Sequence, residues 1–338
     1  MLDCTFFYNK ICSKNVTIKP MKPIFNLIII ATITALITSC TEEKITPSNH
    51  NAIYYWKTKF KLDSMEENFL RRHNIDNIYV KMFDLIPGYD DSNTDINVIP
   101  DATTLFASTV PNDIEIIPVT YITIEALRSM QNQEDLYASL IVERIKAMCR
   151  YNGLEKIQEM QLDCDWTKLT KASYVKLCSS VKEILNSDSI NLSITIRLHQ
   201  LNETPPPSDK GVLMVYNTGA LKNYETNNSI LDTKDIKPYL MKYNGKCTLP
   251  LSYAFPAYGW GVKFINKEFV GIVAENTTPN NESEEIRIER PKFDEIIESK
   301  RLIEKYLGTP ANSNILYHLD INQLKNYTDN EIDKIFAR

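Results

Sequence analysis

Eight apolar, strand-like runs recur along the chain, and amphipathic helical segments lie between most of them. The runs are 54–60, 77–85, 114–122, 159–166, 192–198, 211–217, 249–255 and 315–320. The segments 63–72, 136–150 and 174–185 repeat apolar residues at helical spacing. Strands that alternate with helices pair in parallel, and eight such units favour a closed sheet. The sequence therefore predicts a (β/α)8 barrel, which a last helix at 329–336 completes.

Three connections are longer than a simple βα unit needs, namely 86–113, 202–210 and 256–310. Within the last, the pattern predicts a hairpin at 261–274, a polar stretch at 275–285 and a helix at 291–307. We expect these to be elaborations of one barrel domain spanning residues 53–338, with no second domain.

Composition limits the classes of function. The chain has 338 residues, of which 43% are apolar, so it can bury a full core. Its 38 basic and 43 acidic side chains give a net charge of −5, and no dense basic run occurs, so nucleic acid is not an expected partner. With nine glycines and no glycine-rich phosphate loop or Rossmann fingerprint, no cofactor is expected either.

The N-terminus has the features of an export signal. Lysines precede the uncharged apolar stretch 23–38, which is too short and too interrupted for a transmembrane helix. The stretch ends in Ile37-Thr38-Ser39-Cys40, which resembles a bacterial lipobox. We therefore expect residues 1–40 to hold a signal peptide and Cys40 to carry a lipid that anchors the protein to a membrane. The alternative is a signal peptide of a soluble secreted protein with an incidental cysteine.

Two further features refine this expectation. Met21 lies at an ordinary signal-peptide distance from the lipobox, so translation is expected to start there. The pair Glu42-Glu43 resembles the surface-export signal of Bacteroidota lipoproteins, and the polar segment 41–52 is typical of a flexible tether. The predicted location is the bacterial outer membrane, with exposure at the cell surface; protein partners are unknown.

The remaining cysteines indicate neither metal nor disulfide chemistry. Beyond Cys40 they are Cys149, Cys164, Cys178 and Cys247. They are widely scattered and lack C-x-x-C spacing, and no His-x-His or H-E-x-x-H motif occurs. We predict no metal site and no disulfide framework.

The run Gln161-Leu162-Asp163-Cys164-Asp165-Trp166 alternates polar with apolar side chains. In a strand, alternate residues share a face, so the two aspartates should point one way and the apolar residues the other. Inward residues at the carboxyl end of a barrel strand are functional candidates. The run therefore predicts a site at the mouth of the barrel.

Other strand ends should meet these aspartates at the mouth. Paired carboxylates with basic, amide and aromatic neighbours suit glycoside chemistry, in which one acid protonates the leaving oxygen. We assign Asp165 as the candidate acid, with Asp163 or Asp320 assisting. The candidate substrate-binding residues are Arg197, His199, Tyr216, Asn217, Tyr253 and His318.

Structural roles compete with each of these assignments. A buried ion pair between Asp163 and Arg197 inside the barrel is an alternative to catalysis by Asp163. Asp165 could instead order a loop, and a histidine near a strand end often hydrogen-bonds a loop as well.

Aromatic residues provide a second signal, at the start of the longest connection. Tyr258 and Trp260 lie there, and sugar rings stack on aromatic faces, so both are predicted to contact a carbohydrate ligand. Phe264 and Phe269 follow on the predicted hairpin, where packing onto the barrel is the expected role.

Six segments together carry a resemblance to a known family: 54–57, 78–84, 161–166, 196–201, 215–219 and 253–256. On these segments, residues 53–337 resemble a family of Bacteroidota lipoproteins with a glycoside-hydrolase-like barrel. The pattern Asp163-x-Asp165 is similar to the acidic strand-four motif of chitinase-like barrels. The catalytic Glu that ends that motif is absent, and Trp166 follows instead.

The resemblance implies a lipid-anchored, glycan-acting protein. A glycoside hydrolase that uses strand-end aspartates is the leading hypothesis. A catalytically silent glycan-binding barrel and a structural lipoprotein are the alternatives.

Overall fold

A computed structural model of the chain describes residues 51–88, 97–154 and 156–338. The predicted signal peptide, the lipobox with Cys40 and residues 41–50 of the predicted tether lie outside the described residues.

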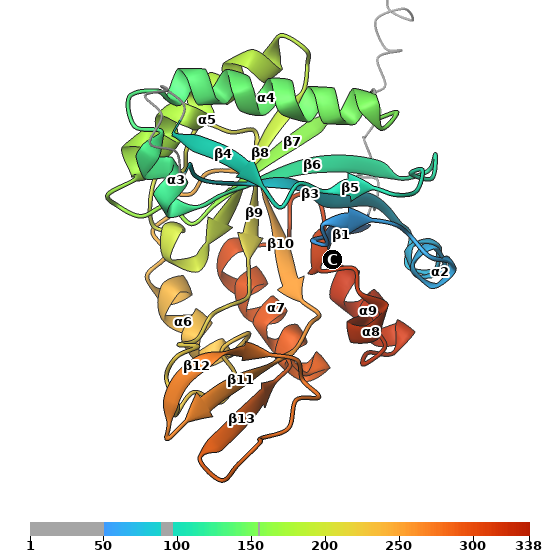
Figure 1. The fold of residues 1–338 in the computed structure, drawn as a ribbon, viewed down its shortest axis with the longest axis vertical. Helices are drawn as coiled ribbons and strands as arrows, with labels where there is room; N and C mark the ends of the chain where they lie inside the picture. Colours follow the sequence, from blue (N-terminus) through green and yellow to red (C-terminus); the bar gives the residue numbers. More distant parts are fainter. Residues whose placement is uncertain (1–50, 89–96, 155) are drawn as a thin grey trace, which may run out of the picture. The chain divides into compact units, whose positions relative to one another are not determined.

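Eight parallel strands form a closed barrel (Figure 1). In barrel order they are β1 (Asn51–Tyr55), β3 (Ile75–Pro87), β6 (Glu115–Ile122), β7 (Glu159–Cys164), β8 (Asn191–Arg197), β9 (Lys210–Met214), β10 (Leu251–Pro256) and β14 (Asn314–Tyr317). The first strand pairs with both β3 and β14, and this double pairing closes the sheet. Each predicted run overlaps one of these strands, so the predicted barrel is confirmed. The first run breaks after Tyr55, and its end becomes β2 (Lys59–Phe60).

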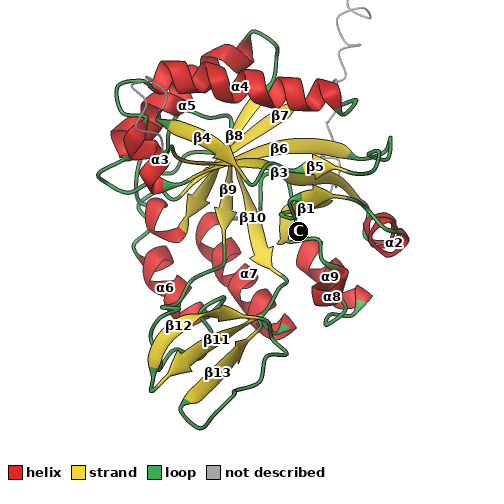
Figure 2. Cartoon of the chain, in the orientation of Figure 1, coloured by secondary structure: helices red, strands yellow, loops and turns green. Residues whose placement is uncertain are grey.

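Helices surround the strands, as the red ribbons in Figure 2 show. They are α2 (Ser64–Arg72), α3 (Ile124–Ser129), α4 (Glu134–Tyr151), α5 (Lys171–Asn186), α6 (Thr233–Met241), α7 (Phe293–Leu307), α8 (Ile321–Leu324) and α9 (Asp329–Phe336). The Asp63 side chain caps α2 by accepting from the backbone N–H groups of Met65 and Glu66. Within the described ranges, no helix is long and apolar enough to cross a membrane.

The longer connections carry extra strands. After β3, the antiparallel β4 (Val98–Asp101) pairs with β3, and β5 (Leu105–Phe106) pairs with β2. The short 3₁₀ helix η1 (Leu198–Gln200) follows β8. After β10, the strands β11 (Trp260–Ile265), β12 (Glu268–Val273) and β13 (Glu284–Glu289) form a three-stranded antiparallel sheet. The predicted hairpin is therefore confirmed, whereas β13 was not predicted because charged residues alternate with its isoleucines.

Apolar packing is divided between the outer layer and the barrel interior. Leu162, Cys164 and Trp166 are buried in the large outer core, as their alternation predicts. Tyrosines and smaller apolar side chains fill much of the interior, including Tyr54 and Met214. The opposite face of β7 is left for polar groups.

Polar side chains of β7 are satisfied inside the barrel by neighbouring strands. Lys210 donates to Glu159 over 2.8 Å near the amino end of β7. One pleat further, the Tyr54 hydroxyl donates to Gln161 Oε1 at 2.8 Å, and Gln161 Nε2 donates to Ser193 Oγ at 3.3 Å. Buried polar groups need such partners, since an unsatisfied one costs about 1–3 kcal/mol.

Replacement of Gln161 tests this interior network. Gln161→Leu keeps a similar volume but leaves the Tyr54 and Ser193 hydroxyls without this partner, so the free energy of unfolding should fall by about 2–4 kcal/mol. Urea denaturation measures the change. A double variant that also carries Tyr54→Phe removes one orphaned hydroxyl and should recover part of the loss. A Gln161→Leu protein as stable as the wild type would contradict the network.

Candidate functional site

Two aspartates and one arginine form the polar centre of the barrel mouth. Asp163, buried on β7, accepts from Thr195 Oγ1 at 2.6 Å and from Arg197 Nη2 at 3.4 Å. Asp165 lies just beyond the end of β7, and its Oδ1 accepts from Arg197 Nε. The Asp165 side chain is 44% exposed, whereas that of Asp163 is 4% exposed. One guanidinium therefore joins both carboxylates, and the predicted buried Asp163–Arg197 pair is confirmed.

Burial controls the electrostatics of this centre. It raises the pKa of Asp163 above its ordinary value; Arg197 opposes the shift and Asp165 adds to it. On the adjacent strand β6, burial together with the charges of Asp165 and Asp163 raises the pKa of Tyr121 to about 12. The Tyr121 hydroxyl therefore keeps its proton at neutral pH.

Two lysines extend the charged lining around the mouth. Lys81 Nζ contacts Asp84 Oδ2 at 3.0 Å, and Lys57 Nζ contacts Glu66 Oε1 at 2.7 Å. Our sequence-based site did not include Lys81. The available signal was its spacing: Lys81 lies two residues after Tyr79 in an otherwise apolar run, so the two side chains share one face of the strand.

Aromatic rings pack around the same opening. Tyr317 lies centrally, with ring centroids 4.7 Å from Tyr216, 5.6 Å from Tyr258 and 5.5 Å from Trp56. Trp260 follows at 5.4 Å from Tyr258. Tyr216, Tyr258 and Trp260 were predicted from the sequence, whereas Trp56 and Tyr317 were not. The structure therefore brings the predicted aromatic residues together with two others, and their contact with a sugar stays a prediction.

His318 and Asp320 follow β14 at the rim. The His318 ring lies 5.3 Å from the Tyr317 ring, and its Nδ1 is buried without a hydrogen-bond partner in the described part of the chain. Burial lowers the pKa of His318 to about 4, although Asp320 opposes the shift. Asp320 itself caps α8 by accepting from the Asn322 backbone N–H at 3.0 Å. This capping bond gives Asp320 a structural role and leaves its assistance to catalysis a prediction.

Three other residues predicted to bind substrate, Tyr253, Asn217 and His199, lie in different environments. Tyr253 points outward from β10 into the outer core, and its hydroxyl donates to the carbonyl of Gly308 at 2.8 Å. The prediction that Tyr253 belongs to the site is therefore wrong. Adjacent residues of a strand point to opposite faces, and the neighbouring Ala254 is the one that faces the interior. Asn217 is exposed and accepts from the Tyr258 hydroxyl at 2.8 Å, and His199 is exposed on η1.

Neither of two surface cavities lies at this mouth. One of about 310 Å³ is lined by Leu70, Pro111 and their neighbours, and one of about 230 Å³ lies between α2 and α8. Across residues 51–88, 97–154 and 156–338, no group of three or more His, Cys, Asp or Glu side chains is placed to hold a metal ion.

Comparison with solved structures shows the fold shared with glycan-degrading enzymes. The spore cortex-lytic enzyme SleL of Bacillus cereus is 12% identical with a TM-score of 0.56, and the match covers 85% of this chain and 74% of that one. A chitinase from Chromobacterium violaceum is 9% identical (TM-score 0.53; 86% and 99% covered). The GH18 chitinase ChiB of Flavobacterium johnsoniae is 12% identical (TM-score 0.50; 85% and 93% covered). At these identities the likeness shows the fold alone.

Searches by sequence give no match. No protein-family model matches the chain, and no curated protein matches it.

The partly buried His318 predicts a specific loss of stability in acid. In the unfolded chain His318 titrates near pH 6.5, and in the folded chain near 4. Between these values the unfolded state binds the extra proton, so stability falls as the pH drops, by up to about 3 kcal/mol. His318→Gln should flatten this part of the dependence, which urea unfolding at about pH 7, 6 and 5 measures. An identical pH dependence in both proteins would refute the assignment.

Proposed function

We propose that the chain is a glycan-binding barrel that holds a sugar chain at its mouth without cleaving it. The observation that carries this proposal is the engagement of both Asp163 and Asp165 by Arg197. A general acid must present a proton to the leaving oxygen, whereas Asp165 accepts a charge-assisted hydrogen bond in this arrangement. The chitinase-like motif ends in a catalytic Glu. In this chain no Glu directly follows Asp165 and Trp166, so that acid is missing.

The lining of the mouth supports a neutral glycan. Trp56 and Tyr317 are partly exposed at the opening and offer rings on which a sugar can stack. Four carboxylates (Asp84, Asp163, Asp165 and Asp320) lie there with three cations (Lys57, Lys81 and Arg197), and Lys57 is also paired with Glu66. An anionic sugar would meet this excess of negative charge, which disfavours uronic acids and sulfated glycans.

The fold supports the same class of ligand. Chitinases and a spore cortex-lytic enzyme share the barrel. Their names imply polymers that contain amino sugars, so oligosaccharides of N-acetylglucosamine are the first probes to use.

Hydrolysis is the second candidate function, and the exposure of Asp165 favours it. With 44% of its side chain exposed, Asp165 can be reached by a ligand in the mouth. A bound sugar that displaced Arg197 from Asp165 would let this carboxylate take up a proton from water and then donate it as the acid, with Asp163 or Asp320 assisting.

One experiment separates the two functions. Purified residues 41–338 are mixed with neutral and uronate-containing oligosaccharides while binding and new reducing ends are both recorded. We expect neutral sugars to bind without release, and Trp56→Ala to weaken binding by about tenfold or more through loss of the stacking surface. Release that disappears in Asp165→Asn would establish the hydrolase instead. Neither binding nor release would overturn both proposals and favour a structural lipoprotein.

We further propose that lipid on Cys40 anchors this barrel to the bacterial outer membrane, facing the cell surface. The lipobox sequence before Cys40 and the pair Glu42-Glu43 after it support this proposal. In a bacterial host, wild-type protein should label with a radioactive fatty acid and sediment with outer membranes. Cys40→Ala should abolish both, and a labelled Cys40→Ala protein would contradict the assignment. Exposure at the surface is tested by protease treatment of intact cells.

A further inference from the structure

We propose that Glu289 is a positioning residue that fixes the indole of Trp260 at the barrel mouth and thereby sets the affinity for a stacked sugar. The inference rests on the proposed glycan-binding function. Glu289 ends β13 and is 1% exposed. Its Oε2 accepts from Trp260 Nε1 at 2.9 Å. No charge of the polar centre described above is involved.

The Glu289 carboxylate is fully occupied by donors from three segments of the chain. Besides Trp260, Oε2 accepts from the backbone N–H of Ser229 at 3.0 Å and from the Ser229 hydroxyl. Its other oxygen, Oε1, accepts from Arg287 Nε at 2.7 Å. A buried carboxylate that holds four donors is costly to remove and leaves little freedom to the groups bound to it.

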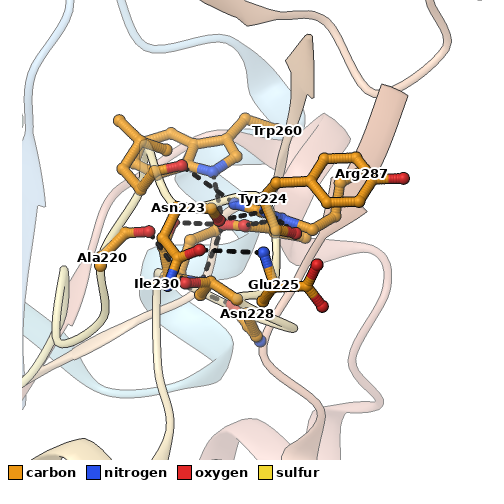
Figure 3. A network of polar contacts seen from close by, with 12 residues as sticks. Ala220, Asn223, Tyr224, Glu225, Asn228, Ile230, Trp260 and Arg287 are labelled. Atoms are coloured by element: carbon orange, nitrogen blue, oxygen red, sulfur yellow. Dashed lines mark hydrogen bonds and ion pairs between the residues drawn. The ribbon is translucent and has the colours of Figure 1, made fainter. Parts of the chain in front are cut away.

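Arg287 extends this network to the connection between β9 and α6. Its guanidinium donates to the carbonyls of Leu221 at 3.0 Å, Asn223 at 2.9 Å and Tyr224 at 3.1 Å (Figure 3). The same close-up shows Trp260 and Arg287 in one connected set of polar contacts, and both donate to Glu289. The network therefore ties the loop after β9 to the three-stranded sheet after β10.

The bond to Glu289 determines which part of Trp260 is available. Because the indole N–H is used by Glu289, this group is not free to donate to a ligand. The ring also meets Tyr258 edge to face, with an interplanar angle of 61°. Two contacts thus hold the indole in one orientation before a ligand arrives, and such preorganisation reduces the entropy lost on binding.

A double-mutant cycle separates positioning from general support of the fold. The variants are Glu289→Gln, Trp260→Phe and their combination. Trp260→Phe keeps an aromatic ring but lacks the N–H that reaches Glu289. Glu275→Gln is the matched control, because Glu275 is paired with Arg290 in the same connection and does not accept the indole N–H of Trp260. Calorimetry with the N-acetylglucosamine tetrasaccharide and with cellotetraose measures affinity, and NMR measures exchange of the Trp260 indole proton.

If Glu289 acts through Trp260, Glu289→Gln should weaken binding by about tenfold and accelerate indole exchange, while Glu275→Gln changes neither. In the Trp260→Phe background, Glu289→Gln should change the affinity by less than about twofold. Equal losses in both backgrounds, or unchanged binding by Glu289→Gln, would overturn the inference. Should Glu289→Gln fail to fold, Trp260→Phe alone decides: binding as tight as wild type overturns the inference, and a similar tenfold loss supports it.

Failure of the proposed function gives a different result. A wild-type protein that binds no sugar of the panel would overturn glycan binding. The exchange of the indole proton would then decide the positioning role by itself: acceleration in Glu289→Gln supports it, and unchanged exchange overturns it.

Discussion

Polar side chains on the inward face of β7 impose the constraint on which the barrel depends. Inside a packed barrel, water cannot hydrogen-bond to every buried donor and acceptor. Adjacent strands must therefore supply hydrogen-bond partners at matching levels along the barrel axis. The pairing of Gln161 with Ser193 in the β7–β8 register aligns the two inward rows. Thr195 and Arg197 then reach Asp163. A slip of one residue would turn these groups outward and leave the carboxylates alone.

Much of the architecture could be predicted because strands buried on both faces leave long apolar runs in the sequence. The alternation around Asp163 also predicted correctly which residues face the interior. The same double burial explains the error at Tyr253, since an apolar strand such as β10 does not show which face is inward. The register of β10 with its neighbouring strands determines which face is inward, and this register cannot be deduced from a single sequence.

The candidate site was less predictable because its geometry comes from pairings between distant segments. Nothing adjacent to Asp165 in sequence indicates that Arg197, on another strand, would contact it. Likewise, the alternating charges of β13 resemble a solvated loop, although Glu289 becomes one of the most buried carboxylates once Trp260 and Ser229 surround it. Such residues gain their roles from tertiary contacts alone.

The barrel closes where β1, its first strand, pairs with β14, its last strand. During synthesis β1 emerges early, yet its partner β14 is made only after all the other described strands. Contacts of such long sequence separation form late and slow the folding of the whole domain. A chain that lacks its last strand would expose an open, apolar edge of β1 and tend to aggregate. The barrel is therefore more vulnerable to truncation at its C-terminus than to insertions in the loops around its mouth.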